Sequence, residues 1–291
     1  MSIVVTGATG HLGRLVVERL LETVPADRIA AVVRDKEKAA DLAARGIEIR
    51  VADYDAPETL AGAFRSGDRV LLISGSEVGR RVPQHTAVIE AAKAAGVAQL
   101  AYTGVLGGPA ADFQLAAEHK VTEQLILDSG LPYTFLRNGW YTENYTENLA
   151  PVLAHGAVVA NAGQGRVASA ARADYAAAAA AVLTGEGHLG RAYELSGDTA
   201  WSFAEYAAAV SAATGKEIAH RDVTAAEHRE ILIGAGLPEM FAEIMVDVDE
   251  AIRRGLLATT TGDLARLAGR PTTPLAESVA AAVRAGTSAG A

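Results

Sequence analysis

The sequence contains no cysteine among its 291 residues. This absence excludes disulfide bonds, thiolate metal sites, iron–sulfur clusters and a cysteine nucleophile, and it makes the cytoplasm the expected compartment. The seven histidines are scattered without the spacing of a metal site. We therefore predict no bound metal.

Long apolar runs and clusters of basic residues are also missing. No run approaches the roughly 18–20 residues of a membrane-spanning helix, and the start, Ser2–Thr6, has neither the basic region nor the cleavage site of a signal peptide. With 26 Lys and Arg against 35 Asp and Glu, the formal net charge is −9, which argues against a nucleic-acid-binding face. We predict no membrane and no nucleic-acid partner, and a homodimer is left open.

What the chain does have is the composition of a globular protein, with 50% hydrophobic and 21% charged residues. In its first half, short apolar runs alternate with helical patterns. The expected strands are 3–6, 29–33, 47–52, 70–74, 100–103 and 133–136, and the expected helices are 12–21, 36–44, 57–64, 83–95 and 116–128. This alternation predicts an α/β fold, a doubly wound parallel sheet of the Rossmann type covered on both faces.

The alternation ends near Arg137. Beyond it we expect a turn at 163–165, a short strand at 191–195 and mostly helix. The predicted division is a dinucleotide-binding Rossmann domain over residues 1–155 and a smaller, mostly helical C-terminal substrate lobe over 156–291, with segments that return to the first domain.

A glycine-rich turn follows the first strand and opens the first helix, with the sequence Gly7-Ala8-Thr9-Gly10-His11-Leu12-Gly13. Gly7 permits the tight turn, Gly10 lets the backbone approach a pyrophosphate, and Gly13 lets the helix pack on the strand. The N-terminus of the helix adds free N–H groups and a favourable dipole. A plain strand–helix turn is the alternative, but this position in the chain favours a dinucleotide site.

Arg34 ends the second strand. NAD-binding folds usually place an acidic residue here for the ribose, whereas an Arg accommodates the 2′-phosphate of NADP. Lys36 and Lys38 add positive charge, while Asp35 could serve an NAD ribose. We favour NADPH as the cofactor.

The ends of the next strands carry small and hydroxyl residues. Ser74-Gly75-Ser76 follows the fourth strand and Tyr102-Thr103-Gly104 the fifth, and both should line the ribose and nicotinamide. Asp53, after the third strand, is expected near the adenine.

The layout resembles the short-chain dehydrogenase superfamily, in which a Tyr-x-x-x-Lys pair protonates the substrate oxygen. Here Leu115 stands in the place of the tyrosine and His119 in that of the lysine. Leucine cannot donate a proton. His119 could orient the nicotinamide ribose as the lysine does elsewhere, or it could be an ordinary helix-surface histidine.

A reductant site without an evident acid has two explanations. Either the acceptor needs no protein acid, or the protein only senses its cofactor. A quinone fits the first explanation, because hydride addition yields a hydroquinone anion that is stabilised by aromatisation and that water can protonate. The enzyme then has mainly to hold the two rings in contact.

A second resemblance extends over nearly the whole chain. It rests on the turn from Thr6 to Gly13, on Val33-Arg34, on the segments 74–79 and 83–85, on 136–145 (LRNGWYTENY), on 169–175, and on 193–198 and 271–278. On these segments the chain resembles the type 2 NAD(P)H:quinone oxidoreductases, NmrA-like members of the atypical short-chain dehydrogenases.

The resemblance implies two-electron reduction of a quinone by hydride from NADPH, without a flavin. It implies cofactor contacts from Gly7, Ala8, Thr9, Gly10, His11, Leu12, Gly13, Arg34, Ser74, Gly75, Ser76, Asn138, Gly139, Trp140, Tyr141, Thr142, Glu143 and Arg172. Trp140 and Tyr141 would form walls for a quinone between the lobes, or simply pack the lobes together. The first alternative is a non-catalytic NADP(H)-sensing regulator. An isoflavone-reductase-like enzyme is a further alternative that we rank below it.

Overall fold

The computed structural model, which describes residues 1–147 and 149–289, is organised around one seven-stranded sheet. All its strands run parallel. In spatial order they are β3 Glu48–Val51, β2 Ile29–Val33, β1 Ile3–Thr6, β4 Arg69–Leu72, β5 Gln99–Val105, β6 Tyr133–Asn138 and β9 Arg191–Leu195. The order reverses between β1 and β4, which is where such sheets bind ligands.

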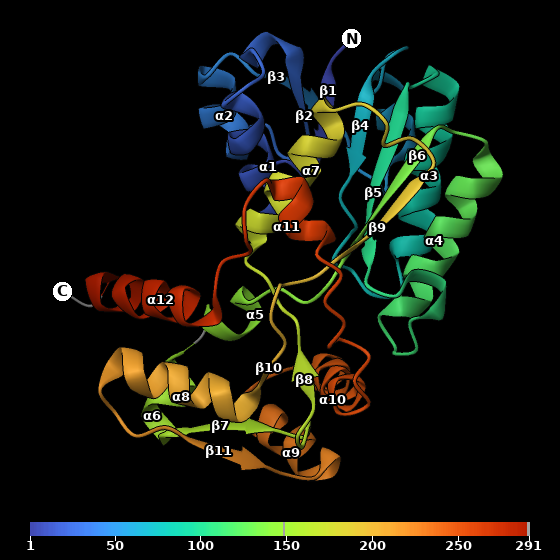
Figure 1. Cartoon of the computed structure of the whole chain (residues 1–291). Helices are drawn as coiled ribbons and strands as arrows, with labels where there is room; N and C mark the ends of the chain where they lie inside the picture. The colour runs from blue at the N-terminus through green and yellow to red at the C-terminus, as the bar shows by residue number, and fades with distance from the viewer. Residues whose placement is uncertain (148, 290–291) are drawn as a thin grey trace.

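Helices cover both faces of this sheet (Figure 1). One face carries α1 His11–Leu21, α2 Ala40–Ala44, α7 Arg172–Thr184 and α11 Asp263–Ala268; the other carries α3 Arg81–Ala95 and α4 Ala116–Ser129. The connections also hold the short 3₁₀ helices η1 Ala26–Arg28, η2 Glu37–Ala39, η3 Pro57–Gly62 and η4 Gly108–Ala110. The predicted fold class, a doubly wound α/β sheet, is confirmed.

The apolar strands explain this layering. Every residue of β2 and of β5 is buried, as expected for strands sandwiched between two helical layers. Two separate hydrophobic clusters result, one under α1 and α7 and one under α3 and α4. The sheet between them is a rigid support for the loops at its carboxyl edge.

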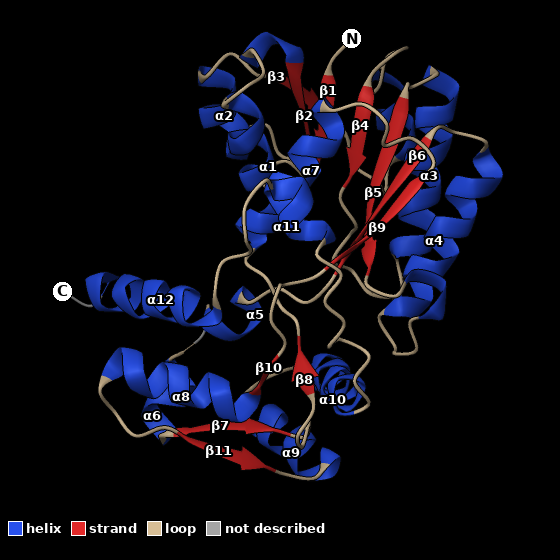
Figure 2. Cartoon of the chain, viewed as in Figure 1, coloured by secondary structure: helices blue, strands red, loops and turns tan. Residues whose placement is uncertain are grey.

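A second lobe lies below the sheet (Figure 2), and it shares a third hydrophobic cluster with residues between the end of β5 and the start of α4, among them Val105, Phe113 and Ala116. It contains two small two-stranded sheets. Its elements are α5 Glu143–Thr146, α6 Ala150–His155, β7 Ala157–Ala160, β8 Arg166–Val167, β10 Trp201–Ser202, α8 Phe203–Thr214, β11 Ala219–Asp222, α9 Ala225–Gly234, α10 Glu239–Arg253 and α12 Leu275–Ala289. Three elements from the later half of the chain belong with the first lobe: β9 is an edge strand of the large sheet, and α7 and α11 pack on it. The predicted domain boundary at residue 155 stays a prediction.

Several predicted elements are shorter than expected. The helix expected over 57–64 is only the 3₁₀ helix η3, because the Thr59 hydroxyl bonds the carbonyls of Ala56 at 2.7 Å and Asp53 at 3.3 Å and holds the chain in a turn. The helix expected over 36–44 begins as η2 and becomes α-helical only in α2. Among the described residues no helix has the length and apolar character to span a bilayer.

Candidate active site

A cavity of about 600 Å³ opens at the carboxyl edge of the sheet, where the strand order reverses. This size is within the range of sites for small ligands. It is lined by Gly7, Thr9, Gly10, His11, Leu12, Gly13, Val33, Arg34, Asp35, Lys38, Ala52, Asp53, Tyr54, Ile73, Ser74, Gly75, Ser76, Glu77 and Gln84. The structure therefore brings the predicted phosphate loop, the end of the second strand and the Ser74–Ser76 loop into one space.

The phosphate loop has the geometry of an anion site. Gly7 has φ +58°, a left-handed conformation that glycine adopts without strain. Gly10 is the N-cap of α1, and within the described chain no side chain caps the helix and no acidic residue occupies its first turn. The amide groups at the start of α1 therefore remain available to a negatively charged group.

Gly13 shows why the loop tolerates no side chain at its end. A Cβ atom there would lie 2.2 Å from the carbonyl oxygen of Gly7 and 2.8 Å from the Cα of Ala8. Both neighbours are backbone, so α1 can approach β1 this closely only with glycine. Ala8, also predicted as a contact, is fully buried and lies outside the cavity lining.

Just after β4, two backbone amides form hydrogen bonds to side-chain hydroxyl groups and not to the backbone of a neighbouring strand. The amide of Ile73 donates to Thr6 Oγ1 at 3.1 Å, and the amide of Ser74 donates to Thr103 Oγ1 at 2.9 Å. The strand predicted over 70–74 therefore ends at Leu72. The chain that follows turns over the cavity as the Ser74–Ser76 loop.

The backbone of Gly75 forms hydrogen bonds to α3 through both its N–H and its carbonyl group. Its N–H donates to Nε2 of His85 at 3.0 Å, and its carbonyl accepts from Nε of Arg81 at 2.6 Å. His85 is fully buried and Arg81 is 8% exposed. Burial and, second, the charge of Arg81 lower the pKa of His85 to about 4, so the ring is neutral near pH 7 and can accept this bond.

His119 is buried, so the alternative of a helix-surface histidine is wrong. Its Nδ1 lies 2.6 Å from the hydroxyl of Tyr102, which is also fully buried. Burial first, then the charge of Arg81, lowers the pKa of His119 to about 3, while burial raises the pKa of Tyr102 above its usual value. Neither group changes protonation near neutral pH, and neither lines the cavity.

The predicted contacts from Asn138 to Glu143, and Arg172, lie outside the cavity lining. Contacts of Glu143 in α5, and of Glu147 directly after it, connect Arg172 to the phosphate loop. Both carboxylate oxygens of Glu143 accept from the amide of Arg172, at 2.9 and 3.0 Å. The Arg172 guanidinium pairs with Glu147, and Glu147 Oε1 lies 3.4 Å from Nδ1 of His11 in the phosphate loop.

Within that segment the chain crosses from one lobe to the other. Trp140 packs on the cluster of the second lobe, whereas Tyr141 packs on the cluster under α1 and α7. Tyr141 meets the Tyr175 ring edge-on at 5.1 Å, and the Arg172 guanidinium lies 5.3 Å from its ring centre. Both rings therefore contribute to packing on the two sides of the junction, and their role as quinone walls stays a prediction.

The α3 residues that contact the Ser74–Ser76 loop and Glu77 were not among the site residues predicted from the sequence. Arg81, Gln84 and His85 stand at positions i, i+3 and i+4, so they share one helix face, and all three are buried. A helix that packs on a sheet is expected to bury apolar residues. Three polar residues on one face of this helix could therefore have indicated, from the sequence alone, that this face contacts polar groups. Glu77 and Glu147 had no comparable signal, because surface carboxylates are common.

Comparisons with known proteins agree with this geometry. A family model described as NAD(P)H-binding matches residues 7–186. The chain is 47% identical over 277 residues to quinone oxidoreductase 2 of Escherichia coli (strain K12), spanning 95% of this chain and 97% of that protein. Among solved structures, it resembles the NADPH-dependent quinone oxidoreductase QOR2 of Escherichia coli complexed with NADPH, with a TM-score of 0.94 and 47% identity over 96% of this chain and 99% of that one.

A further solved structure, the triphenylmethane reductase of Citrobacter sp. complexed with NADP(H), has a TM-score of 0.93 and 44% identity, over 97% of this chain and 100% of that one. These similarities extend over both lobes.

Proposed function

This chain belongs to the NAD(P)H-binding family, in the branch of the type 2 quinone oxidoreductases, and we propose that it reduces quinones by direct hydride transfer from NADPH without a flavin. The observation that carries the proposal is the single cavity shared by the phosphate loop, Arg34 and the Ser74–Ser76 loop. The residues there have the chemistry that the two ends of NADPH require.

The start of α1 would hold the pyrophosphate, because its N-cap is a glycine and its first amides are available. Arg34 would hold the 2′-phosphate, since a guanidinium can bind it through two parallel hydrogen bonds. The clamped Gly75 loop would position the ribose and nicotinamide half. NADPH, when bound, supplies a hydride to an electrophilic acceptor.

The nature of the acceptor follows from what this chain can donate. Leu115 has no proton to give, and His119 and Tyr102 hold each other in a buried pair that keeps its protonation state near pH 7. A general acid ordinarily contributes about 10² to 10⁴ in rate. An acceptor that becomes stable as an anion loses little without one, and a quinone is such an acceptor because its reduced ring is aromatic.

A second acceptor class is favoured by the similarity to triphenylmethane reductase. A triphenylmethane dye is a carbocation that takes up hydride at carbon and needs no proton at all. Both acceptor types therefore suit a site without an acid. We propose that the acceptor enters between the lobes beside Trp140 and Tyr141, where flat rings can stack on a flat molecule.

The test is a turnover assay with protein from which small molecules have been removed by dialysis. We expect the absorbance of reduced nicotinamide to fall well above the uncatalysed rate with NADPH and a simple benzoquinone. The protein itself should show no flavin absorbance, and added flavin should not raise the rate. A flat trace together with tight NADPH binding would instead identify a cofactor sensor.

A further inference from the structure

Arg34, the cation predicted to meet the 2′-phosphate, already has a partner within the chain. Its Nη1 lies 3.5 Å from Oε1 of Glu77, and the two side chains are 69% and 43% exposed. Both residues line the same cavity. A ligand that enters the cavity therefore meets a cation whose charge is shared with a carboxylate.

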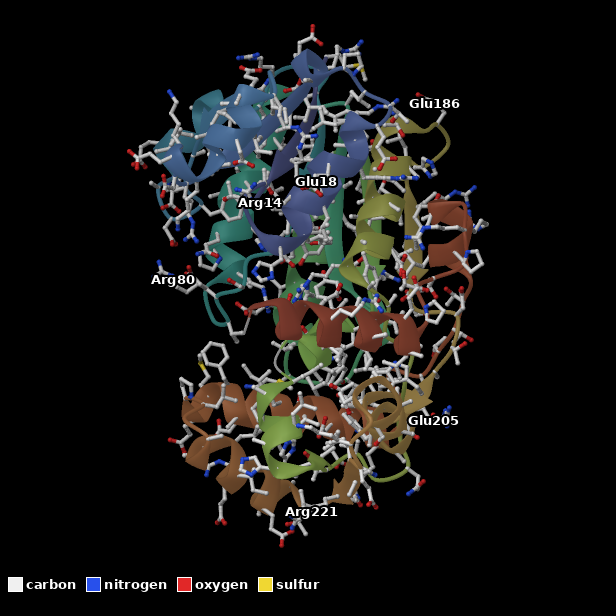
Figure 3. All side chains as sticks on the ribbon, turned by 90° about the vertical axis from the view of Figure 1, so that its left-hand side faces the viewer. Arg14, Glu18, Arg80, Glu186, Glu205 and Arg221 are labelled. Atoms are coloured by element: carbon white, nitrogen blue, oxygen red, sulfur yellow. The ribbon has the colours of Figure 1, made fainter. Side chains whose placement is uncertain are left out.

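Glu77 is held at the rim of the cavity by more than this pair. Its other oxygen, Oε2, accepts from Nε2 of the buried Gln84 at 3.1 Å, and its carbonyl accepts from the amide of Arg80 at 3.1 Å. The side chain of Arg80, at the edge of the molecule in Figure 3, pairs with Asp55 at 2.8 Å, and its Nε lies 3.9 Å from Glu77 Oε2. The position of the Glu77 carboxylate is thus set by α3 and by the turn before it.

Asp35 is the other carboxylate next to Arg34, but it serves a different purpose. Its Oδ1 accepts from the amide of Glu37 at 2.9 Å, which closes the turn into η2. Glu77 is therefore the carboxylate that pairs with Arg34. From the sequence, Arg34 favoured NADPH and Asp35 could have favoured NADH. In the structure, the carboxylate that opposes Arg34 is that of Glu77.

We infer that Glu77 is a specificity-determining residue that competes with the 2′-phosphate of NADPH for Arg34. The inference rests on the proposed function, because it concerns the cofactor of the same site. A phosphate monoester carries a charge of about −1.5 to −2 near pH 7, so it is repelled by Glu77 as it approaches Arg34. The 2′-hydroxyl of NADH can instead donate a hydrogen bond to this carboxylate.

Glu77 and Arg34 therefore act in opposite directions. Arg34 favours NADPH, whereas Glu77 weakens NADPH binding and supports NADH. The pair keeps the preference for NADPH moderate and eases the release of the oxidised, phosphorylated product. Since both groups are partly exposed, we expect the contribution of Glu77 to be modest and to shrink as salt concentration rises.

Glu77→Gln tests this directly, because the amide keeps the shape of the side chain and an acceptor for Gln84 but loses the charge. The dissociation constant of NADPH, followed by nicotinamide fluorescence at low salt, should fall about two- to fivefold. That of NADH should stay constant or rise. In an Arg34→Ala background the same substitution should have a smaller effect on NADPH, because the competition for the guanidinium is gone.

Asp55→Asn is the matched control. Asp55 bonds the same Gln84 amide at 3.1 Å and Arg80 at 2.8 Å, but it lies outside the cavity lining. Both dissociation constants should be unchanged in this variant. If Asp55→Asn tightens NADPH as much as Glu77→Gln does, the effect is general surface charge and the inference is overturned.

The two proposals fail in different ways. A wild-type protein that binds neither NADPH nor NADH overturns the proposed function. A wild-type protein that binds NADPH, with Glu77→Gln binding it equally or more weakly, overturns the inference about Glu77 alone. An equal gain in the Arg34→Ala background overturns the competition for Arg34.

Discussion

The imidazole of His85 bonds Gly75 through one nitrogen and Thr122 through the other. Because Nε2 accepts from the Gly75 amide at 3.0 Å, it carries no proton, and Nδ1–H is left to donate to the Thr122 hydroxyl at 2.9 Å. That hydroxyl in turn donates to the carbonyl of Glu118. A buried chain of hydrogen bonds thus runs from the Ser74–Ser76 loop through α3 to α4, and it requires neutral His85.

Removing the hydrogen-bond acceptor at His85 should weaken NADPH binding. His85→Leu keeps the volume but leaves the Gly75 amide without its partner, so we expect a NADPH dissociation constant raised about five- to tenfold, equivalent to the roughly 1–1.4 kcal/mol of one hydrogen bond. His85→Gln offers an oxygen at a similar reach and should restore most of the affinity. Fluorescence titration of both variants makes the comparison. If His85→Leu binds NADPH as the wild type does, His85 does not position the loop.

Stability should fall in mild acid because of the same residue. The pKa of His85 is about 4 in the folded protein against 6.5 for a free side chain. Between these values the unfolded chain binds one more proton at this residue, so His85 alone lowers the free energy of unfolding by about 1.4 kcal/mol for each pH unit as the pH decreases from 6.5 to 4.

Urea titrations at pH 7, 5.5 and 4.5 measure this slope, and it should be shallower in His85→Gln by that amount. The titratable groups around the ring are Arg81 on α3, Tyr102 on β5 and His119 on α4, all present in both proteins. Equal slopes in the two proteins would contradict a buried, neutral His85.

Gly13→Ala should destabilise the protein and abolish dinucleotide binding together. The added Cβ meets the backbone of Gly7 at 2.2 Å, and neither partner can move without shifting α1 from β1. We expect a loss of about 1–3 kcal/mol by thermal or urea unfolding. Gly62→Ala, where a Cβ would meet nothing within 4 Å, is the control and should leave both properties unchanged. A Gly13→Ala protein with normal affinity would refute the close approach of helix and strand.

Tyr102→Phe should leave quinone reduction largely intact. Loss of a general acid would cost about 10² to 10⁴ in kcat, whereas a buried structural partner of His119 should cost less than about tenfold. Steady-state kcat with NADPH and benzoquinone, measured at a temperature where circular dichroism shows the variant folded, distinguishes the two roles. A fall of a hundredfold or more would make this pair a proton donor and would remove the main argument for the acceptor class.

A largely buried group of charged side chains joins β6 to α4 and to β9 and should contribute to stability. Arg137 donates two hydrogen bonds to Glu123, at 2.9 and 2.7 Å, and one to Glu194 at 2.8 Å, with the Glu123 side chain only 4% exposed. Glu123→Ala leaves Arg137 with Glu194 as its one remaining carboxylate partner here and should lower the free energy of unfolding by about 2–3 kcal/mol.

Glu186→Ala is the comparison, since this partner of Arg69 is 86% exposed and its loss should cost at most about 1 kcal/mol. The two variants are compared by urea unfolding. If both variants lose a similar free energy of unfolding, burial does not account for the contribution of the Arg137–Glu123 pair to stability.

The order of the strands and helices could be predicted from the sequence because each strand is a short apolar run that can be recognised by itself. The apolar runs in β1 and β2, and the glycine turn between β1 and α1, depend on neighbours within a few residues. Element ends were less accessible. Leu72 ends β4 because Thr6 and Thr103, far away in the sequence, take the next two amides.

Local chemistry in the sequence alone thus determined the fold class, and it predicted the phosphate loop and the candidate cation Arg34, since glycine spacing and hydrophobic periodicity act over short distances. Tertiary structure alone decided which polar groups meet. It placed His85 beneath Gly75, paired Glu77 with Arg34, and buried His119 against Tyr102. Such pairings depend on how α3, α4 and the loops pack on the sheet, and burial then sets the charge of each group, which no single stretch of residues encodes.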